Sequence, residues 1–212
     1  MATLAATFNT ADKSTPGYYG PPQTALLLLD FHSMLIQKAA GQKALAALEV
    51  AAKMRTWAKS HGIQVIHCLI DINAMPFPTC KDADRLAGVV AAMKLSGGEE
   101  PAELLEGGGD DVTFTRRPGH VSALKSPGLD NFLQKKGIKS LVLAGLSTSG
   151  CVMRTAITAS DAEYVVSVIS DGCADPVEDV HDMMVGKVFN QRGYVTTAAE
   201  FQEGFAKAAG GE

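Results

Sequence analysis

The sequence predicts an α/β protein whose parallel sheet is doubly wound, with a layer of helices on each face. Three observations indicate this class. Short apolar runs typical of buried parallel strands recur along the chain, and longer segments with helical spacing separate them. The alternation continues over the whole chain without internal repeats. A length of 212 residues with 46% hydrophobic residues suits one well-buried domain and leaves little room for two.

Strands are expected where aliphatic and β-branched residues follow one another. The first, 24–29, is a continuous apolar run, as in a strand covered on both faces, and it ends at Asp30. The fourth is rich in leucine and valine and ends at small residues. The full set is 24–29, 64–70, 111–115, 140–144, 165–170 and 194–196.

Helices are expected between these strands. The segment 43–61 carries alanine, leucine and methionine at helical spacing, which indicates packing against a core. The full set lies near 43–61, 82–93, 129–136, 150–162, 177–191 and 198–208. Because parallel strands need crossover connections, this order predicts a three-layer αβα sandwich.

Residues 1–22 are expected to form an irregular arm in front of a domain at 23–208. The arm is rich in glycine, proline, serine and threonine, and it lacks the charged start and apolar core of a secretory signal. In an oligomer, Tyr18 and Tyr19 could pack on a neighbouring subunit.

Composition excludes several classes of function. A formal charge of −4 and a pI near 5.7 provide no basic surface for nucleic acid or an anionic membrane. Four cysteines without a CxxC pair predict reduced thiols, neither a disulfide framework nor a zinc cluster. No segment approaches the roughly 20 apolar residues that span a bilayer. These features predict a cytoplasmic protein.

Cys151 stands where the fourth predicted strand gives way to a helix, after the small residues of 144–150. A thiol in the first turn of a helix feels the positive end of the helix dipole, which lowers its pKa and favours the nucleophilic thiolate. The alternative is a small apolar residue buried under the helix, because free cysteine is among the most buried residue types.

Two further places could supply partners for this thiol. Asp30 ends the first strand, and the carboxyl ends of parallel strands carry the ligand site in open α/β sheets; it could equally cap a turn. Arg116 and Arg117 follow the third strand, where an arginine pair could also be solvated surface.

Together, these segments resemble the isochorismatase-like cysteine hydrolases, which include nicotinamidases, carbamoylsarcosine amidases and isochorismatases. The matching features are an apolar strand that ends in Asp30, a cation ahead of Ser122-Ala123, and the turn Gly-x-x-Thr-x-x-Cys-Val from Gly145 to Val152. The resemblance covers about residues 22–200. It implies a Rossmann-like fold with six parallel strands in the order 3-2-1-4-5-6.

The resemblance also implies a catalytic set of Asp30, Arg117 and Cys151. The family normally has lysine as the cation; Arg117-Pro-Gly-His resembles a common Lys-Pro-Gly-His variant, so Arg117 is preferred over Arg116. An arginine keeps the positive charge but cannot exchange protons as an amine does.

The oxyanion site is expected at the turn of Leu146 and Ser147, with backbone N–H groups of Ser147 and Cys151 and a cis peptide between Leu146 and Ser147. His32 and His120 could line the substrate pocket and form hydrogen bonds there near pH 7. The proline- and phenylalanine-containing segment 73–81 is expected to be a pocket wall or lid.

The predicted function is hydrolysis of a C–N bond in a small amide or ureido substrate through an acyl-enzyme. An isochorismatase-type vinyl-ether hydrolase, and an impaired homologue that acts as a binding or scaffold protein, are the alternatives. Expected partners are a small-molecule substrate and further copies of the chain in a dimer or tetramer.

No cofactor and no metal are expected. The turn 145–150 lacks the Walker lysine and the dinucleotide glycine spacing. The stretch 66–74 lacks the Asp-x-His spacing of the metal site that some nicotinamidases have. Within it, His67 alternates with apolar neighbours and is expected to be a hydrogen-bonded core histidine. His181 is expected to be exposed.

Overall fold

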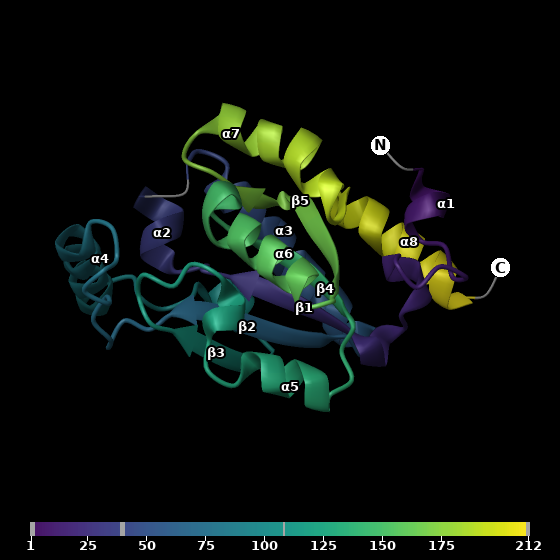
Figure 1. The fold of residues 1–212 in the computed structure, drawn as a ribbon, viewed down its shortest axis with the longest axis horizontal. Coiled ribbons are helices and arrows are strands. Elements are labelled where there is room, and N and C mark those ends of the chain that lie inside the picture. The colour runs from purple at the N-terminus through teal and green to yellow at the C-terminus, as the bar shows by residue number, and fades with distance from the viewer. Residues whose placement is uncertain (1–2, 39–40, 108, 211–212) are drawn as a thin grey trace.

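A computed structural model describes residues 3–38, 41–107 and 109–210. Its centre is a six-stranded parallel sheet with the order β3-β2-β1-β4-β5-β6 (Figure 1). This is the predicted order. The strands are β1 (Thr24–Leu29), β2 (Gln64–Ile70), β3 (Val112–Arg116), β4 (Ser140–Leu146), β5 (Val165–Ala174) and β6 (Tyr194–Thr196).

Three strands differ from their predicted bounds at the carboxyl end. Strand β4 continues through Gly145 and Leu146, and β5 continues to Ala174, because the two strands pair again after a register shift between Leu143 and Gly145. The sequence did not predict this continuation, because both added segments contain small or polar residues that are not typical of a buried strand. Strand β3 extends to Arg116, which is register partner to Ile70 of β2.

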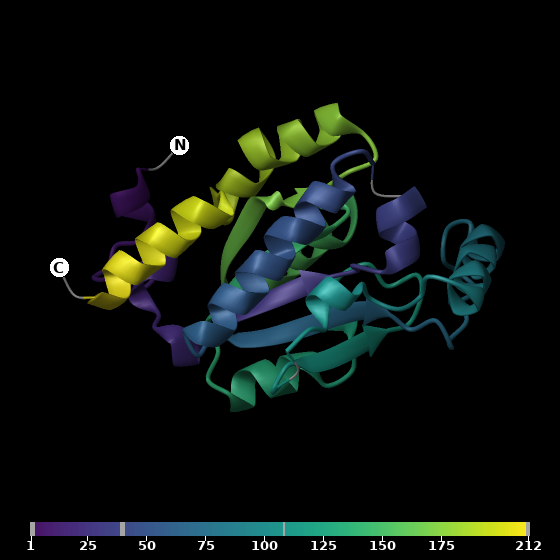
Figure 2. The same ribbon diagram turned by 180° about the vertical axis from the view of Figure 1, so that it is seen from behind.

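Helices cover both faces of the sheet, as predicted. On one face lie α3 (Ala44–Ser60) and α8 (Ala198–Gly210), and Figure 2 shows both crossing the sheet. On the other face lie α5 (Leu129–Lys135) and α6 (Met153–Asp161) (Figure 1). Strand β1 is fully buried between the layers: Leu26 and Leu28 belong to one core, and Leu27 and Leu29 to the other.

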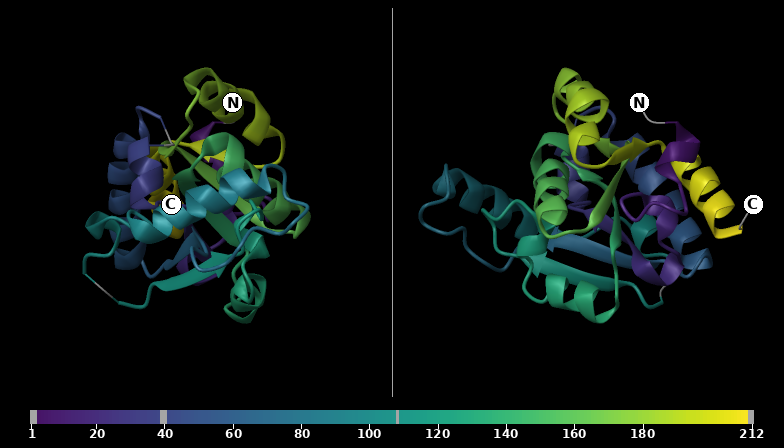
Figure 3. Two further views of the ribbon diagram at one scale, coloured as in Figure 1. Left: turned by 90° about the vertical axis from the view of Figure 1, so that its left-hand side faces the viewer. Right: turned by 45° about the vertical axis from the view of Figure 1, so that its right-hand side comes forward.

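Shorter helices surround this sandwich. They are α1 (Leu4–Thr7), α2 (Ser33–Lys38), α4 (Ala83–Leu95) and α7 (Glu178–Met183). The helix α4 projects from the body of the molecule (Figure 3). Within the described residues, no helix combines the length and apolar character needed to cross a membrane.

The first residues of the chain pack on α8. Residues 3–22 contain only short helical turns, but Phe8 is buried and its ring meets that of Phe201 edge-on, with centroids 5.4 Å apart. Phe8 also occupies the space beside Gly204. The arm is therefore part of the core on that face. Packing of Tyr18 and Tyr19 on a neighbouring subunit stays a prediction.

A buried ion cluster joins α3 to the start of β3. Asp111 accepts hydrogen bonds from Arg55 Nε at 2.7 Å and Lys59 Nζ at 2.6 Å. Beside them, His67 Nδ1 lies 2.8 Å from Glu100 Oε1, which confirms His67 as a hydrogen-bonded core histidine. Burial raises the pKa of Asp111, but the hydrogen bonds and charges of Lys59 and Arg55 lower it more, so the net pKa is below its ordinary value.

Asp111→Asn should reduce the free energy of unfolding at pH 7 by roughly 2 to 4 kcal/mol, because it leaves the buried Arg55 without its carboxylate. A carboxyl group with a lowered native pKa stabilises the fold above its unfolded pKa, about 3.9, and loses this effect as the pH falls. The difference between wild type and variant should therefore shrink below about pH 4. Urea unfolding at a series of pH values measures it, and a constant difference would contradict the assignment.

Gly145→Ala should destabilise the junction of β1 and β4. A Cβ at this position would lie 2.4 Å from Leu29 Cβ and 2.6 Å from Leu29 O, so the backbones must separate, at a cost of roughly 1 to 3 kcal/mol. Gly88→Ala in α4, where nothing lies within 4 Å of the added Cβ, is the matched control and should be neutral or slightly stabilising. Equal melting temperatures for Gly145→Ala and wild type would refute this prediction.

Candidate active site

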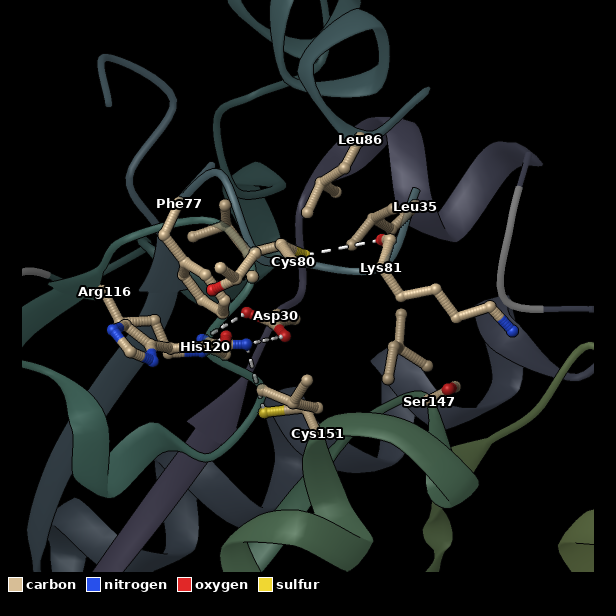
Figure 4. Close-up of a pocket in the computed structure, with 15 residues that line it drawn as sticks. Asp30, Leu35, Phe77, Cys80, Lys81, Leu86, Arg116, His120, Ser147 and Cys151 are labelled. Atoms are coloured by element: carbon tan, nitrogen blue, oxygen red, sulfur yellow. Dashed lines mark hydrogen bonds and ion pairs between the residues drawn. The ribbon is translucent and has the colours of Figure 1, made fainter. Parts of the chain in front are cut away.

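Asp30, Arg116 and Cys151 meet at the carboxyl edge of the sheet (Figure 4). Arg116 Nη1 donates to Asp30 Oδ1 at 2.9 Å, and Nη2 donates to Asp30 Oδ2 at 2.5 Å. The same Nη2 lies 3.5 Å from Cys151 Sγ. All three side chains are buried, so the guanidinium contacts both a carboxylate and a thiol away from bulk water.

The backbone brings these residues together from three strand ends. Asp30 leaves β1 with a φ of 55°, in the left-handed region that aspartate adopts more readily than most residues. Arg116 is the last residue of β3, and β2 separates β3 from β1. The Arg116 side chain therefore extends past the end of β2 to reach the Asp30 carboxylate. This span suits a long side chain.

The prediction that Arg117 accompanies Asp30 is wrong. Arg117 is exposed, and it donates from Nε to Met75 O at 2.8 Å and from Nη2 to Pro76 O at 3.2 Å. Successive side chains of a strand point to opposite faces. The more buried face of β3 carries Val112, Phe114 and Arg116. The alternation of side chains along the strand therefore places Arg116 on the buried side and Arg117 on the other, and this was the signal that distinguishes the two arginines.

The charge on Arg116 is fixed by its surroundings. Burial lowers the pKa of the guanidinium, but the charges of Asp30 and Cys151 raise it more, so the net pKa lies above its ordinary value. Arg116 Nε also donates to His120 O at 3.0 Å. The guanidinium therefore stays charged and is held in one orientation.

The Cys151 thiol has a raised pKa, contrary to the expectation from its helix. Burial raises the pKa first, and the charge of Asp30 raises it further; Arg116 and the hydrogen bond with Thr155 lower it by less. Loss of hydration thus outweighs the positive end of the helix. A raised pKa favours the protonated thiol, so formation of a thiolate here would require a base.

The turn that carries Cys151 is bonded on several sides. The peptide between Leu146 and Ser147 is cis, as predicted. Ser147 O accepts from Gly150 N at 3.1 Å. Asp175, at the end of β5, accepts from Ser149 N at 2.8 Å and Ser149 Oγ at 2.7 Å. These bonds fix the turn relative to β4 and β5.

Two further contacts of this turn were not predicted from the sequence. Thr148 Oγ1 lies 2.8 Å from His181 Nδ1, so His181 is half-buried and not, as predicted, an exposed residue of a charged helix face. Ala123 N donates to Thr155 Oγ1 at 2.9 Å, and the same oxygen lies 3.8 Å from Cys151 Sγ. The sequence offers no signal for these pairs, because they join elements far apart in the chain.

The two candidate histidines have different surroundings. His32 is 1% exposed: Ile70 N donates to its Nε2 at 3.0 Å, so Nδ1 carries the hydrogen and donates to Gly98 O at 2.6 Å. The prediction that His32 lines the pocket is therefore wrong, and the residue joins β2 to the loop after α4. His120 does line the pocket, where its ring lies 5.1 Å from that of Phe77.

A cavity of about 540 Å³ opens above the three site residues. Leu146 and Ser147 line it near Cys151, as predicted. The predicted wall is also present, because Phe77, Thr79, Cys80 and Lys81 line the opposite side. The remaining surface is mainly apolar, from Leu35, Ile70, Leu86 and Val121. Over the residues that the structure describes, no group of three His, Cys, Asp or Glu side chains is placed to hold a metal ion.

Comparison with known proteins identifies the family and the fold. The sequence profile of the isochorismatase domain matches residues 24–200. Maleamate amidohydrolase of Pseudomonas putida is 27% identical over 202 residues, which cover 88% of each chain. An Arabidopsis thaliana protein named as a probable inactive nicotinamidase is 33% identical over 86 residues, 40% of this chain and 44% of that protein. The crystal structure of a cysteine hydrolase from Pseudomonas syringae pv. phaseolicola shares the fold, with a TM-score of 0.77, 19% identity and coverage of 90% of this chain and 95% of that one.

Exchange of each arginine for glutamine should separate their roles. Arg116→Gln removes the cation beside Cys151, which should raise the thiol pKa further and slow alkylation by iodoacetamide at pH 8 by about tenfold or more. Arg117→Gln should change that rate by less than about twofold, because its guanidinium contacts only backbone carbonyls of the wall. Mass spectrometry of the Cys151 peptide gives both rates. The reverse order would restore Arg117 to the site.

Proposed function

Because the chain belongs to the isochorismatase family of hydrolases, we propose that it hydrolyses the C–N bond of a small amide or ureido substrate, with Cys151 as nucleophile. The observation that carries this proposal is the contact of Arg116 with both Asp30 and Cys151 beneath one cavity that all three residues line. A thiol is suited to attack a carbonyl carbon, and a neighbouring carboxylate can move the protons that such a reaction requires.

The first half of the reaction forms an acyl-enzyme. A carboxylate oxygen of Asp30 accepts the proton of Cys151 Sγ, and the thiolate attacks the carbonyl carbon to form a C–S bond. Asp30 then gives that proton to the substrate nitrogen, the C–N bond breaks, and the amine or ammonia leaves. A base is required because burial and the charge of Asp30 keep the pKa of Cys151 high.

The second half releases the acid. A water molecule gives a proton to Asp30 as its oxygen attacks the thioester carbon, the C–S bond breaks, and the sulfur regains its proton from Asp30. Arg116 remains charged throughout, holds the carboxylate by two hydrogen bonds and stabilises negative charge on the sulfur.

The backbone N–H groups of Ser147 and Cys151 are proposed to receive the oxyanion. Such a donor contributes on the order of 3 kcal/mol to acyl transfer. The hydrogen bonds of Asp175 to Ser149 support this role, because they hold the turn beside the cavity that Ser147 and Cys151 line. The name of the relative maleamate amidohydrolase supports an amide as substrate.

A catalytically impaired homologue that binds a ligand is the second candidate. Arg116 engages both oxygens of Asp30, so the carboxylate must accept the thiol proton while it remains in a bidentate ion pair. The relative named as a probable inactive nicotinamidase supports this alternative. A vinyl-ether hydrolase is a third reading, in which Asp30 acts as the acid and no thiol is needed.

Cys151→Ser and Asp30→Asn distinguish these readings. An amide hydrolase should lose at least about a thousandfold in kcat with either variant, because the nucleophile or the proton carrier is missing. A vinyl-ether hydrolase should tolerate the first change and fail with the second. The measurements are ammonia release from a panel of small amides and ureido acids and hydrolysis of isochorismate, with thermal melts to confirm folding.

Cys80→Ser is the matched control, since it makes the same exchange in the cavity wall. It should retain kcat within about tenfold, since its sulfur takes no part in the proposed chemistry. Absence of turnover by the wild type, with equal ligand binding by all variants, would favour the impaired homologue.

A further inference from the structure

We infer that Lys81 binds a carboxylate at the far end of the substrate, so that the preferred amide carries a negative charge. This inference rests on the proposed function, because it specifies which amides the same cavity takes. Its basis is the distribution of charge around the cavity.

The charges of the catalytic residues compensate each other, and that of Lys81 does not. Asp30 and Arg116 form a bidentate ion pair, and Cys151 is a neutral thiol at rest. Lys81 is the other charged residue that lines the cavity. Within the described ranges, no carboxylate forms an ion pair with its ammonium group. Among the side chains that line the cavity, one positive charge is therefore not compensated, which favours an anionic ligand.

The backbone of Lys81 belongs to a wall that is tied to the catalytic segment. Arg117 donates to Met75 O and Pro76 O, and Cys80 Sγ lies 3.5 Å from Lys81 O. A Cβ on Gly119 would come within 2.7 Å of the Phe77 ring, so the wall packs closely on the loop after β3. The ammonium group is thus carried by a fixed support, although its side chain is exposed.

The arrangement of the cavity suits a ligand with two polar ends. In Figure 4, the Lys81 nitrogen lies on the Ser147 side of the site, away from Arg116 and His120. Apolar side chains, among them Leu35 and Leu146, also line this cavity. A short carbon chain would pack there, with its amide carbon at Cys151 and its carboxylate at Lys81. The monoamide of a small dicarboxylic acid has this shape and charge.

Two alkylating reagents test the charge preference without requiring turnover. Iodoacetate and iodoacetamide both form a C–S bond with the thiolate and release iodide, but only the first carries a negative charge. The rate ratio of iodoacetate to iodoacetamide at Cys151, read from its peptide by mass spectrometry, cancels changes in thiol pKa. We expect Lys81→Met to lower this ratio roughly threefold to fivefold, the effect of a partly exposed charge pair.

Further variants sharpen the result. Lys81→Arg should keep the ratio and Lys81→Glu should lower it beyond Lys81→Met. Lys94→Met, at an exposed lysine of α4, is the matched control and should leave it unchanged. Added salt should lower the ratio in the wild type and have little effect in Lys81→Met. A ratio that is the same in Lys81→Met and wild type would overturn the inference.

Turnover separates this inference from the proposed function. For succinamate and its uncharged analogue butyramide, Lys81→Met should raise KM for the first and leave the second unchanged, with similar kcat. If the wild type hydrolyses succinamate and Lys81→Met does so with the same KM, Lys81 has no such role. If the wild type hydrolyses no amide, the proposed function fails, and the alkylation ratio still decides whether Lys81 recognises an anion.

Discussion

The buried ion pair between Asp30 and Arg116 is the interaction on which the site depends. Removing two charges from water costs several kcal/mol per ion, so the pair persists only because two direct hydrogen bonds and a third to His120 O satisfy it. Because β2 lies between β3 and β1, the ion pair spans the carboxyl end of β2 and links the ends of the two strands on either side of it. Arg116 thereby holds Asp30 in place and also contacts Cys151, and as a guanidinium it does not take up a proton from either group.

The loop after β3 connects Arg116 to the wall of the cavity. Arg116 contacts the Cys151 thiol, while Arg117, the next residue, donates to carbonyl groups of the cavity wall. Gly119 and His120 then contact Phe77. The five consecutive residues from Arg116 to His120 therefore connect the buried ion pair to the wall of the cavity. A change in either arginine is expected to alter one part and leave the other in place.

Much of the architecture could be predicted from the sequence, and the failures have physical causes. The continuous apolar run at 24–29 defined β1, because a strand covered on both faces has no polar interruption. The bounds of β2 were also predicted to the residue, although Gln64 and His67 interrupt its apolar run. The strand order, the cis peptide and the places of Asp30 and Cys151 followed from the resemblance. The choice of Arg117 failed because motif spacing was weighed above the alternation of burial along β3. The raised pKa of Cys151, and the partners of His32 and His181, depend on contacts between distant segments, which a single sequence does not display.

The presence of arginine in place of lysine beside Cys151 has a consequence for chemical modification. A catalytic lysine would be open to amine-directed reagents and would lose its charge in strong alkali. Here the guanidinium resists both, since its pKa is raised and it is enclosed by protein. The amine that lines the cavity is that of Lys81, in the wall. Acylation of surface amines would therefore remove the positive charge of the cavity wall, while the charge beside the thiol stays as it is.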